Sequence, residues 1–163
     1  MVEISRSRKS VSLFSGAGGM DVGFARAGFE SVLACELDRD ACETFNLNLH
    51  LVGHRKNRIE PTSVKDLDLS SVPSDVDVVF GGPPCQGFSV AGKMDPEDER
   101  SQLLLSFFDV VDQTQPKGFV CENVKALAIS NRWEGIRRTI LRRARINYRV
   151  SVVRDFGTDG GLS

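Results

Sequence analysis

Short apolar runs alternate with segments of helical periodicity along this 163-residue chain. Runs rich in Val, Leu and Phe predict buried strands at residues 11–14, 31–36, 76–80, 118–122 and 148–153. Helices are predicted between them, at residues 20–28, 38–49, 101–113 and 133–146. Residues 50–75 carry a weaker pattern that allows one short strand around 58–64. Such alternation indicates an α/β fold, a doubly wound and mainly parallel sheet with helices on both faces.

A cysteine follows the third predicted strand through a stiff turn. Residues 81–89 read Gly-Gly-Pro-Pro-Cys-Gln-Gly-Phe-Ser, and the two prolines fix φ and remove two backbone donors. This places Cys85 at the carboxyl end of a strand, where open α/β sheets bind their ligands. Most cysteines are buried and unreactive, and we expect this of Cys35, Cys42 and Cys121. The stiff turn and the polar neighbours Gln86 and Ser89 favour a nucleophile at Cys85.

A glycine-rich turn follows the first predicted strand. Ser15-Gly16-Ala17-Gly18-Gly19 leads into a helix, and glycine lets the backbone approach a bound nucleotide closely. The turn fits the nicotinamide fingerprint poorly, because Asp21 stands three residues after Gly18. Glu36 ends the second predicted strand, and a carboxylate there can accept hydrogen bonds from ribose hydroxyls. Its spacing from the turn favours ribose binding over a solvated strand end.

A second carboxylate follows the fourth predicted strand. The run 118–122 ends in Glu122, and Asn123 and Val124 come next. A glutamic acid beside bulky apolar residues has a raised pKa and can hold or deliver a proton. Alone, Glu122 would be an exposed acid or a helix cap; together with the Cys85 turn, it is interpreted as a proton carrier.

Together these segments resemble the DNA (cytosine-5)-methyltransferase family, whose members include restriction-modification enzymes. The matching segments follow the family's order within residues 10 to 157: residues 13–19, Glu36, residues 81–89, residues 98–103 and residues 122–124. The resemblance implies a Rossmann-like fold that binds S-adenosyl-L-methionine. The residues that it places on the cofactor side are Phe14, Gly16, Gly18, Glu36, Asp66 and Leu103.

The resemblance also implies a covalent mechanism. Cys85 would add to C6 of a cytosine flipped out of double-stranded DNA, while Glu122 interacts with N3 and the methyl group goes to C5. The substrate-side residues that it implies are Pro84, Gln86, Ser89 and Asn123. Residues 86–93 resemble the family's loop over the target base.

After residue 157 this sequence departs from the order of segments found in the family. In the family an Asp-Phe-Gly segment precedes a Pro-Gln segment and an arginine-bearing strand, whereas Asp155-Phe156-Gly157 here continues into a different sequence. We therefore expect residues 1–163 to form one incomplete S-adenosylmethionine-binding catalytic domain, truncated before the last strand and without a target-recognition domain. We also expect it to be inactive alone and to self-associate or bind a complementary subunit. A truncated product, an expression fragment and a split-enzyme subunit all fit.

Two alternative functions stay open. Some members of the superfamily act on tRNA cytosine, so RNA is an alternative substrate. The chain could also be a non-catalytic remnant or subunit that keeps the cofactor pocket and binds a partner. The recognition sequence is not predictable, because the domain that would read it is not in the sequence.

Composition agrees with one intracellular globular domain. Hydrophobic residues make up 40% and charged residues 26% of the chain, and no apolar stretch is long enough to span a membrane. The basic start lacks the apolar core of a signal peptide, so a cytoplasmic, DNA-associated protein is expected. Four cysteines without a C-x-x-C pair give no zinc signature, and the acidic run 95–99 is interpreted as a solvated hinge, so no metal is predicted.

Charge is unevenly distributed along the chain. Residues 1–120 carry 12 Lys or Arg against 18 Asp or Glu, a net −6, and residues 121–163 carry 9 against 4, a net +5. Most of this positive charge is arginine on the predicted helix 133–146. Its apolar positions recur at helical spacing, so the arginines are interpreted as a solvated face rather than as phosphate contacts.

Overall fold

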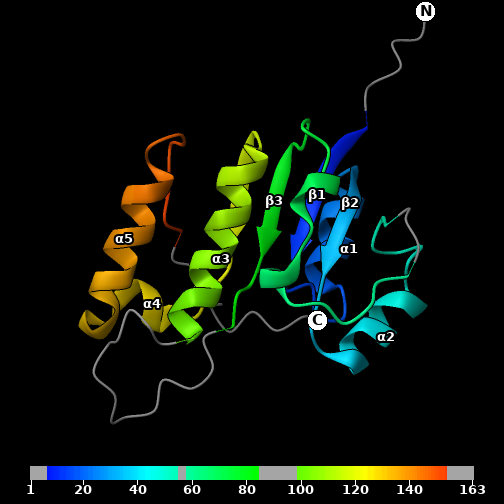
Figure 1. Cartoon of the computed structure of the whole chain (residues 1–163), viewed down its shortest axis with the longest axis horizontal. Coiled ribbons are helices and arrows are strands. Elements are labelled where there is room, and N and C mark those ends of the chain that lie inside the picture. Colours follow the sequence, from blue (N-terminus) through cyan, green and yellow to red (C-terminus); the bar gives the residue numbers. More distant parts are fainter. Residues whose placement is uncertain (1–6, 55–57, 85–98, 154–163) are drawn as a thin grey trace, which may run out of the picture.

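The structure is a computed structural model that describes residues 7–54, 58–84 and 99–153 (Figure 1). Its centre is a parallel sheet of β1 (Arg8–Leu13), β2 (Phe29–Cys35), β3 (Val78–Gly81) and β4 (Gly118–Cys121), in the order β2-β1-β3-β4. The helices are α1 (Gly19–Arg26), α2 (Arg39–Leu47), α3 (Glu99–Thr114), α4 (Lys125–Ile129) and α5 (Glu134–Ala144). Short 3₁₀ turns are η1 (Val64–Asp66), η2 (Leu69–Ser71) and η3 (Asn131–Trp133).

Helices cover both faces of the sheet, which confirms the predicted doubly wound α/β architecture. Successive strand residues point to opposite faces. On one face Phe24 of α1 stacks on Phe80 of β3, with ring centroids 3.9 Å apart. On the other face Val11 and Val79 form a core with Phe107 of α3. In the described part of the chain, no helix is long and apolar enough to cross a membrane.

Four of the five predicted strands are confirmed, and the prediction at 148–153 is wrong. Those residues form no strand. Instead the Tyr148 ring packs edge-to-face on Phe119 at 5.2 Å, and its hydroxyl donates to the Pro116 carbonyl at 3.0 Å. Side-chain packing therefore holds the start of this segment. Among the described strands, β4 and β2 are the two edges of the sheet.

The short strand that the pattern allowed around 58–64 does not form either. A side chain satisfies the backbone there: Asn46 donates to the Ile59 carbonyl and accepts from the Ile59 N–H, both at 2.8 Å. Ile59 also fills a second apolar cluster with Phe45 and Val52. The segment is thus anchored through α2 rather than through a strand ladder.

Candidate active site

The sheet register brings the predicted site segments to one edge. Leu13 of β1 is level with Cys35 of β2 and with Gly81 of β3, and Gly81 is level with Cys121 of β4. The residues that directly follow the four strands therefore lie side by side, because the strands are parallel and end at the same edge of the sheet. After β1 and β3 the chain enters the glycine turn and the Gly-Pro-Pro turn, and the first residues after β2 and β4 are Glu36 and Glu122. One edge holds all four predicted segments.

The glycine turn needs its two glycines for different reasons. Both have left-handed backbone, with φ of 54° at Gly16 and 92° at Gly18. A Cβ on Gly18 would lie 2.6 Å from Cγ1 of Val52 and 3.1 Å from the Phe45 ring, so core packing requires glycine there. A Cβ on Gly16 would meet nothing within 4 Å, so this glycine borders open space that a ligand can occupy. Phe14 also has a positive φ, 54°.

Glu36 joins the glycine turn to the end of β2. One carboxylate oxygen accepts from the Gly16 N–H at 2.8 Å. The other accepts from the N–H groups of Leu37 and Asp38, at 2.7 and 2.8 Å. A carboxylate has about four acceptor positions, so about one is left for a ribose hydroxyl. Asp38 in turn caps α2 by accepting from the Ala41 N–H at 2.8 Å.

The other two predicted cofactor residues come from separate elements. Asp66 is exposed at the end of η1. Leu103 lies in α3, half-buried against the main core, which Phe14 and Leu67 also contact. A cavity of about 430 Å³ lies along the outer edge of β2 and is lined by Leu67 together with Val32, Ala34 and Arg58 among others. The six predicted cofactor residues are not part of its lining.

Glu122 lies against the turn that precedes Cys85. Its N–H donates to the Gly81 carbonyl at 2.9 Å, which extends the β3–β4 pairing by one residue. A Cβ on Gly82 would lie 2.9 Å from Oε2 of Glu122, so the absence of a side chain at Gly82 gives the carboxylate its place. The Glu122 side chain is exposed, so the burial assumed from the sequence is not present in this structure.

Asn123 links the same two loops. Its Nδ2 donates to the Pro83 carbonyl at 3.0 Å, and its Oδ1 accepts from the Val124 N–H at 2.9 Å. The side chain thus holds the Pro-Pro turn beside the end of β4. Its predicted contact with substrate stays a prediction, as does that of the exposed Pro84.

Several predicted features lie outside the described residues. They are Cys85, Gln86 and Ser89, the loop 86–93, residues 95–98 of the acidic run and the segment 155–157. Among the other cysteines, Cys35 and Cys42 are buried, and burial with the nearby Glu36 charge raises the pKa of Cys35 to about 12. Cys121 is half-buried.

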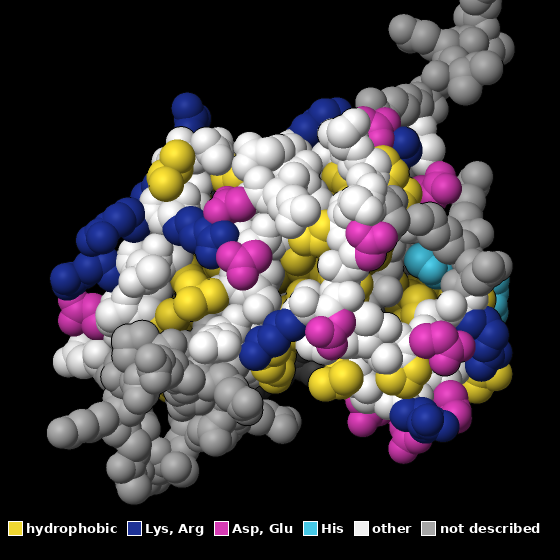
Figure 2. All heavy atoms as spheres, in the orientation of Figure 1, with side chains coloured by type: hydrophobic (Ala, Val, Ile, Leu, Met, Phe, Trp, Pro, Cys, Tyr) yellow, Lys and Arg dark blue, Asp and Glu magenta, His cyan; other side chains and the backbone are white. Residues whose placement is uncertain are grey.

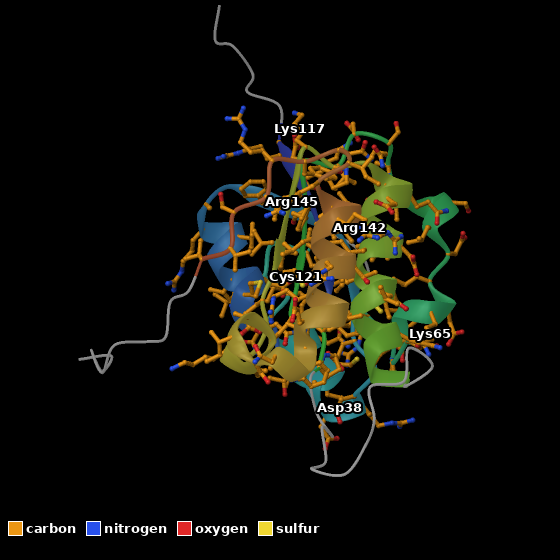
Figure 3. The ribbon with its side chains drawn as sticks, turned by 90° about the vertical axis from the view of Figure 1, so that its left-hand side faces the viewer. Asp38, Lys65, Lys117, Cys121, Arg142 and Arg145 are labelled. Atoms are coloured by element: carbon orange, nitrogen blue, oxygen red, sulfur yellow. The ribbon has the colours of Figure 1, made fainter. Side chains whose placement is uncertain are left out.

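Two of the arginines predicted to form a solvated face, Arg137 and Arg143, are instead held in structural contacts, and Arg138, Arg142 and Arg145 are exposed. Dark blue side chains gather along α5 in Figure 2. Arg143 pairs with Asp109 and Asp112 of α3, and Arg137 donates to backbone carbonyls. In Figure 3, Arg142 and Arg145 lie toward the opposite end of the molecule from Asp38, which follows β2 at the site edge. These two side chains therefore do not border the site.

One buried acid was not recognised as a site residue from the sequence. Asp21 of α1 is only 1% exposed, directly beyond the glycine turn. The available signal was its spacing: Asp21 precedes Phe24 by three positions, so both lie on the helix face that meets the sheet. The sequence interpretation used Asp21 only to reject the nicotinamide fingerprint.

Comparison with known families shows which family this chain belongs to. The family description "C-5 cytosine-specific DNA methylase" matches residues 8–155. The chain belongs to this family. Members of the family use S-adenosyl-L-methionine as the methyl donor, which agrees with the predicted cofactor.

Named relatives agree with this assignment. The type II methyltransferase M.AquIA of Picosynechococcus sp. is 46% identical over 123 residues, which cover 74% of this chain and 50% of the relative. M1.HphI of Haemophilus parahaemolyticus is 44% identical over 126 residues, covering 74% of this chain and 33% of the relative. The match thus spans half or less of the length of these relatives.

Solved structures share the fold. A proposed DNA modification methyltransferase encoded within an E. coli prophage has a TM-score of 0.68 at 32% identity, covering 85% of this chain and 38% of that chain. The Dnmt2 methyltransferase of S. pombe has a TM-score of 0.56 at 25% identity, covering 84% and 41%. The Rossmann-like methyltransferase fold predicted from the sequence is confirmed.

Proposed function

We propose that this chain is the cofactor-binding and catalytic part of an enzyme that methylates C5 of cytosine in DNA. The observation that carries the proposal is the contact between Gly82 and Glu122. It joins the segment that leads to Cys85 with the glutamate that follows β4, although the two are 40 positions apart. A nucleophile and a proton carrier on adjacent loops are what attack on a cytosine ring requires.

The residues of the glycine turn fit the cofactor. Open space beside Gly16 allows close approach to the backbone, and Glu36 keeps about one acceptor position for a ribose hydroxyl. Phe14 and Leu103 would add apolar contacts, and Asp66 would lie near the adenine. S-adenosyl-L-methionine, when bound, supplies an activated methyl group on a sulfonium.

The chain's own residues activate the base. Cytosine C5 is a weak nucleophile until the aromatic ring is interrupted. The Cys85 thiolate adds to C6, and Glu122 donates a proton or hydrogen bond at N3 as negative charge develops. Electron density then reaches C5, which takes up the methyl group. Loss of the C5 proton restores the double bond and expels the cysteine thiolate.

The substrate is proposed to be a cytosine flipped out of double-stranded DNA, at a cost of a few kcal/mol for unstacking. Pro84, Gln86, Ser89 and Asn123 are the residues proposed to surround it. This substrate implies an intracellular location.

A complementary chain is proposed to complete the assembly. β4 is an edge strand, and its Val120 is 46% exposed. Exposed apolar strand edges recruit further strands or chains. Size-exclusion chromatography of the purified 163-residue chain should show self-association, and a monodisperse, active monomer would contradict the need for a partner.

Trapping tests the mechanism. The chain, with a complementary subunit supplied if required, is incubated with the methyl donor and DNA that contains 5-fluorocytosine. A covalent adduct through Cys85 is expected, and it should be absent in Cys85→Ala and retained in Cys121→Ala. Cofactor binding by Cys85→Ala should stay within a few-fold of wild type.

The substrate class needs a separate comparison. With the complementary subunit supplied, tritiated-methyl transfer to duplex DNA should exceed transfer to tRNA. The reverse result would favour the RNA alternative, and cofactor binding without transfer to either substrate would favour a non-catalytic subunit. Substantial activity of Cys85→Ala would overturn the covalent mechanism.

A further inference from the structure

Asp21 is a buried carboxylate with no charged partner among the residues that act on its pKa. It occupies the first turn of α1 and is 1% exposed. Among the residues that the structure describes, neither carboxylate oxygen makes a hydrogen bond of regular geometry, although the Ser12 hydroxyl is near enough to lower the pKa. Below it lies β1, whose Ser12 hydroxyl is 2.9 Å from the hydroxyl of Ser15 in the glycine turn. One helical turn further, Phe24 closes this face by stacking on Phe80.

The surroundings of Asp21 oppose its negative charge. Burial raises the pKa of Asp21 to about 6, while the Ser12 hydroxyl and the backbone of Asp21 lower it less. No charged side chain contributes to this shift. The charged residues on the neighbouring β1, α1 and β2, and directly after β2, are Arg8, Lys9, Arg26, Glu30 and Glu36. At neutral pH the protein therefore holds an unpaired negative charge beneath the glycine turn.

Burying an unpaired carboxylate costs folding free energy, so a purely structural role does not explain Asp21. An uncharged side chain of similar size would fill the same space without the desolvation penalty. The N-terminal end of α1 stabilises a negative charge only in part. The carboxylate is therefore suited to attract a cation that binds nearby, and the adjacent glycine turn is where the methyl donor is proposed to bind.

We propose that Asp21 is the counter-charge for the sulfonium of the methyl donor, and that it lets the site distinguish this cation from its uncharged thioether product. The inference rests on the proposed function. Direct contact is not required, because a charge in a protein interior acts over several ångströms with little screening. Asp21 is therefore a positioning residue that favours the charged ligand and eases release of the neutral product.

Calorimetric titration tests the inference without measuring turnover. The probes are S-adenosyl-L-methionine and S-adenosyl-L-homocysteine, which differ by the methyl group and the positive charge. For wild type the ratio of their affinities is compared with that of Asp21→Asn. We expect the variant to lose preference for the sulfonium by roughly tenfold, which is the interaction of two unit charges about 12 Å apart at an effective dielectric constant near 20.

The matched control is Asp40→Asn. Asp40 also lies in the first turn of a helix, α2, but it is exposed. This variant should keep the wild-type affinity ratio. A change in the ratio equal to that of Asp21→Asn would mean that any nearby carboxylate has the same effect, which would overturn a specific role for Asp21.

A second measurement does not depend on folding of the variant. In wild type, protonation of Asp21 between pH 7.5 and pH 5 should reduce the preference for the sulfonium. A ratio that is constant over this range, or unchanged in folded Asp21→Asn, would overturn the counter-charge while leaving the proposed function intact. Failure of wild type to bind either compound would instead contradict the proposed function itself.

Discussion

The Glu36 carboxylate accepts a 2.8 Å hydrogen bond from the backbone N–H of Gly16, and the two residues are 20 positions apart. The same carboxylate accepts from Leu37 and Asp38, so one side chain fixes both the glycine turn and the chain after β2. A residue predicted to bind ribose therefore also builds the loop in which the ribose would lie.

Glu36→Gln should weaken both the fold and cofactor binding. The amide keeps only one acceptor oxygen, so at least one backbone N–H loses its partner, at a cost of about 1–3 kcal/mol. Chemical denaturation would measure the loss, and calorimetry with S-adenosyl-L-methionine would measure binding. Asp40→Gln, at an exposed position, is the control, and equal stability of wild type and Glu36→Gln would contradict this structural role.

The two glycines of the turn should respond differently to alanine. Gly18→Ala should destabilise the fold by roughly 2–4 kcal/mol, because the new Cβ meets Val52 and Phe45 and the backbone is left-handed. Gly16→Ala should cost roughly 1–2 kcal/mol, since only the backbone strain applies. Thermal unfolding compares the two. A larger loss at Gly16 would show that the turn packs differently.

Gly82→Ala should reduce methyl transfer more than stability. The new Cβ would lie 2.9 Å from Glu122 Oε2, the end of a flexible and exposed side chain, which can move away at little cost. The displaced carboxylate would then no longer serve N3 of the base. Gly118→Ala is the control, because its Cβ meets nothing within 4 Å. Comparable transfer rates in the two variants, in an active assembly, would argue against the position of Glu122.

Stability should fall as pH rises through the range in which Asp21 ionises. The pKa of Asp21 is about 6 in the folded chain against an ordinary value of 3.8, so the folded state binds more protons between these values. The stabilisation from the protonated acid is complete below pH 3.8 and is lost as pH rises through 6, by up to about 3 kcal/mol. Asp21→Asn should flatten this part of the curve of unfolding free energy against pH. An unchanged curve would show that Asp21 does not titrate there.

Local sequence was enough to predict four strands, their order along the chain and the four site segments. β3 is a continuous apolar run, as expected where both faces of a strand are buried, whereas β1 begins with Arg8 and Lys9 and is buried only from Ser10 onward. Glu36 and Glu122 were recognised because each directly follows such a run. These features depend on neighbouring residues, so they are visible in the sequence.

Other features depend on partners that are far away in the sequence. Residues 148–153 carry a strand-like pattern, but a strand needs a ladder, and Tyr148 instead packs on Phe119. Gly16 and Gly18 look alike in the sequence. Only the folded structure shows that Val52 leaves no room for a side chain at Gly18, whereas Gly16 borders open space. The same holds for Asp21. Its residue type predicts a solvated charge, and only the packing of α1 on the sheet decides that the charge is buried, because burial is a property of the assembled fold.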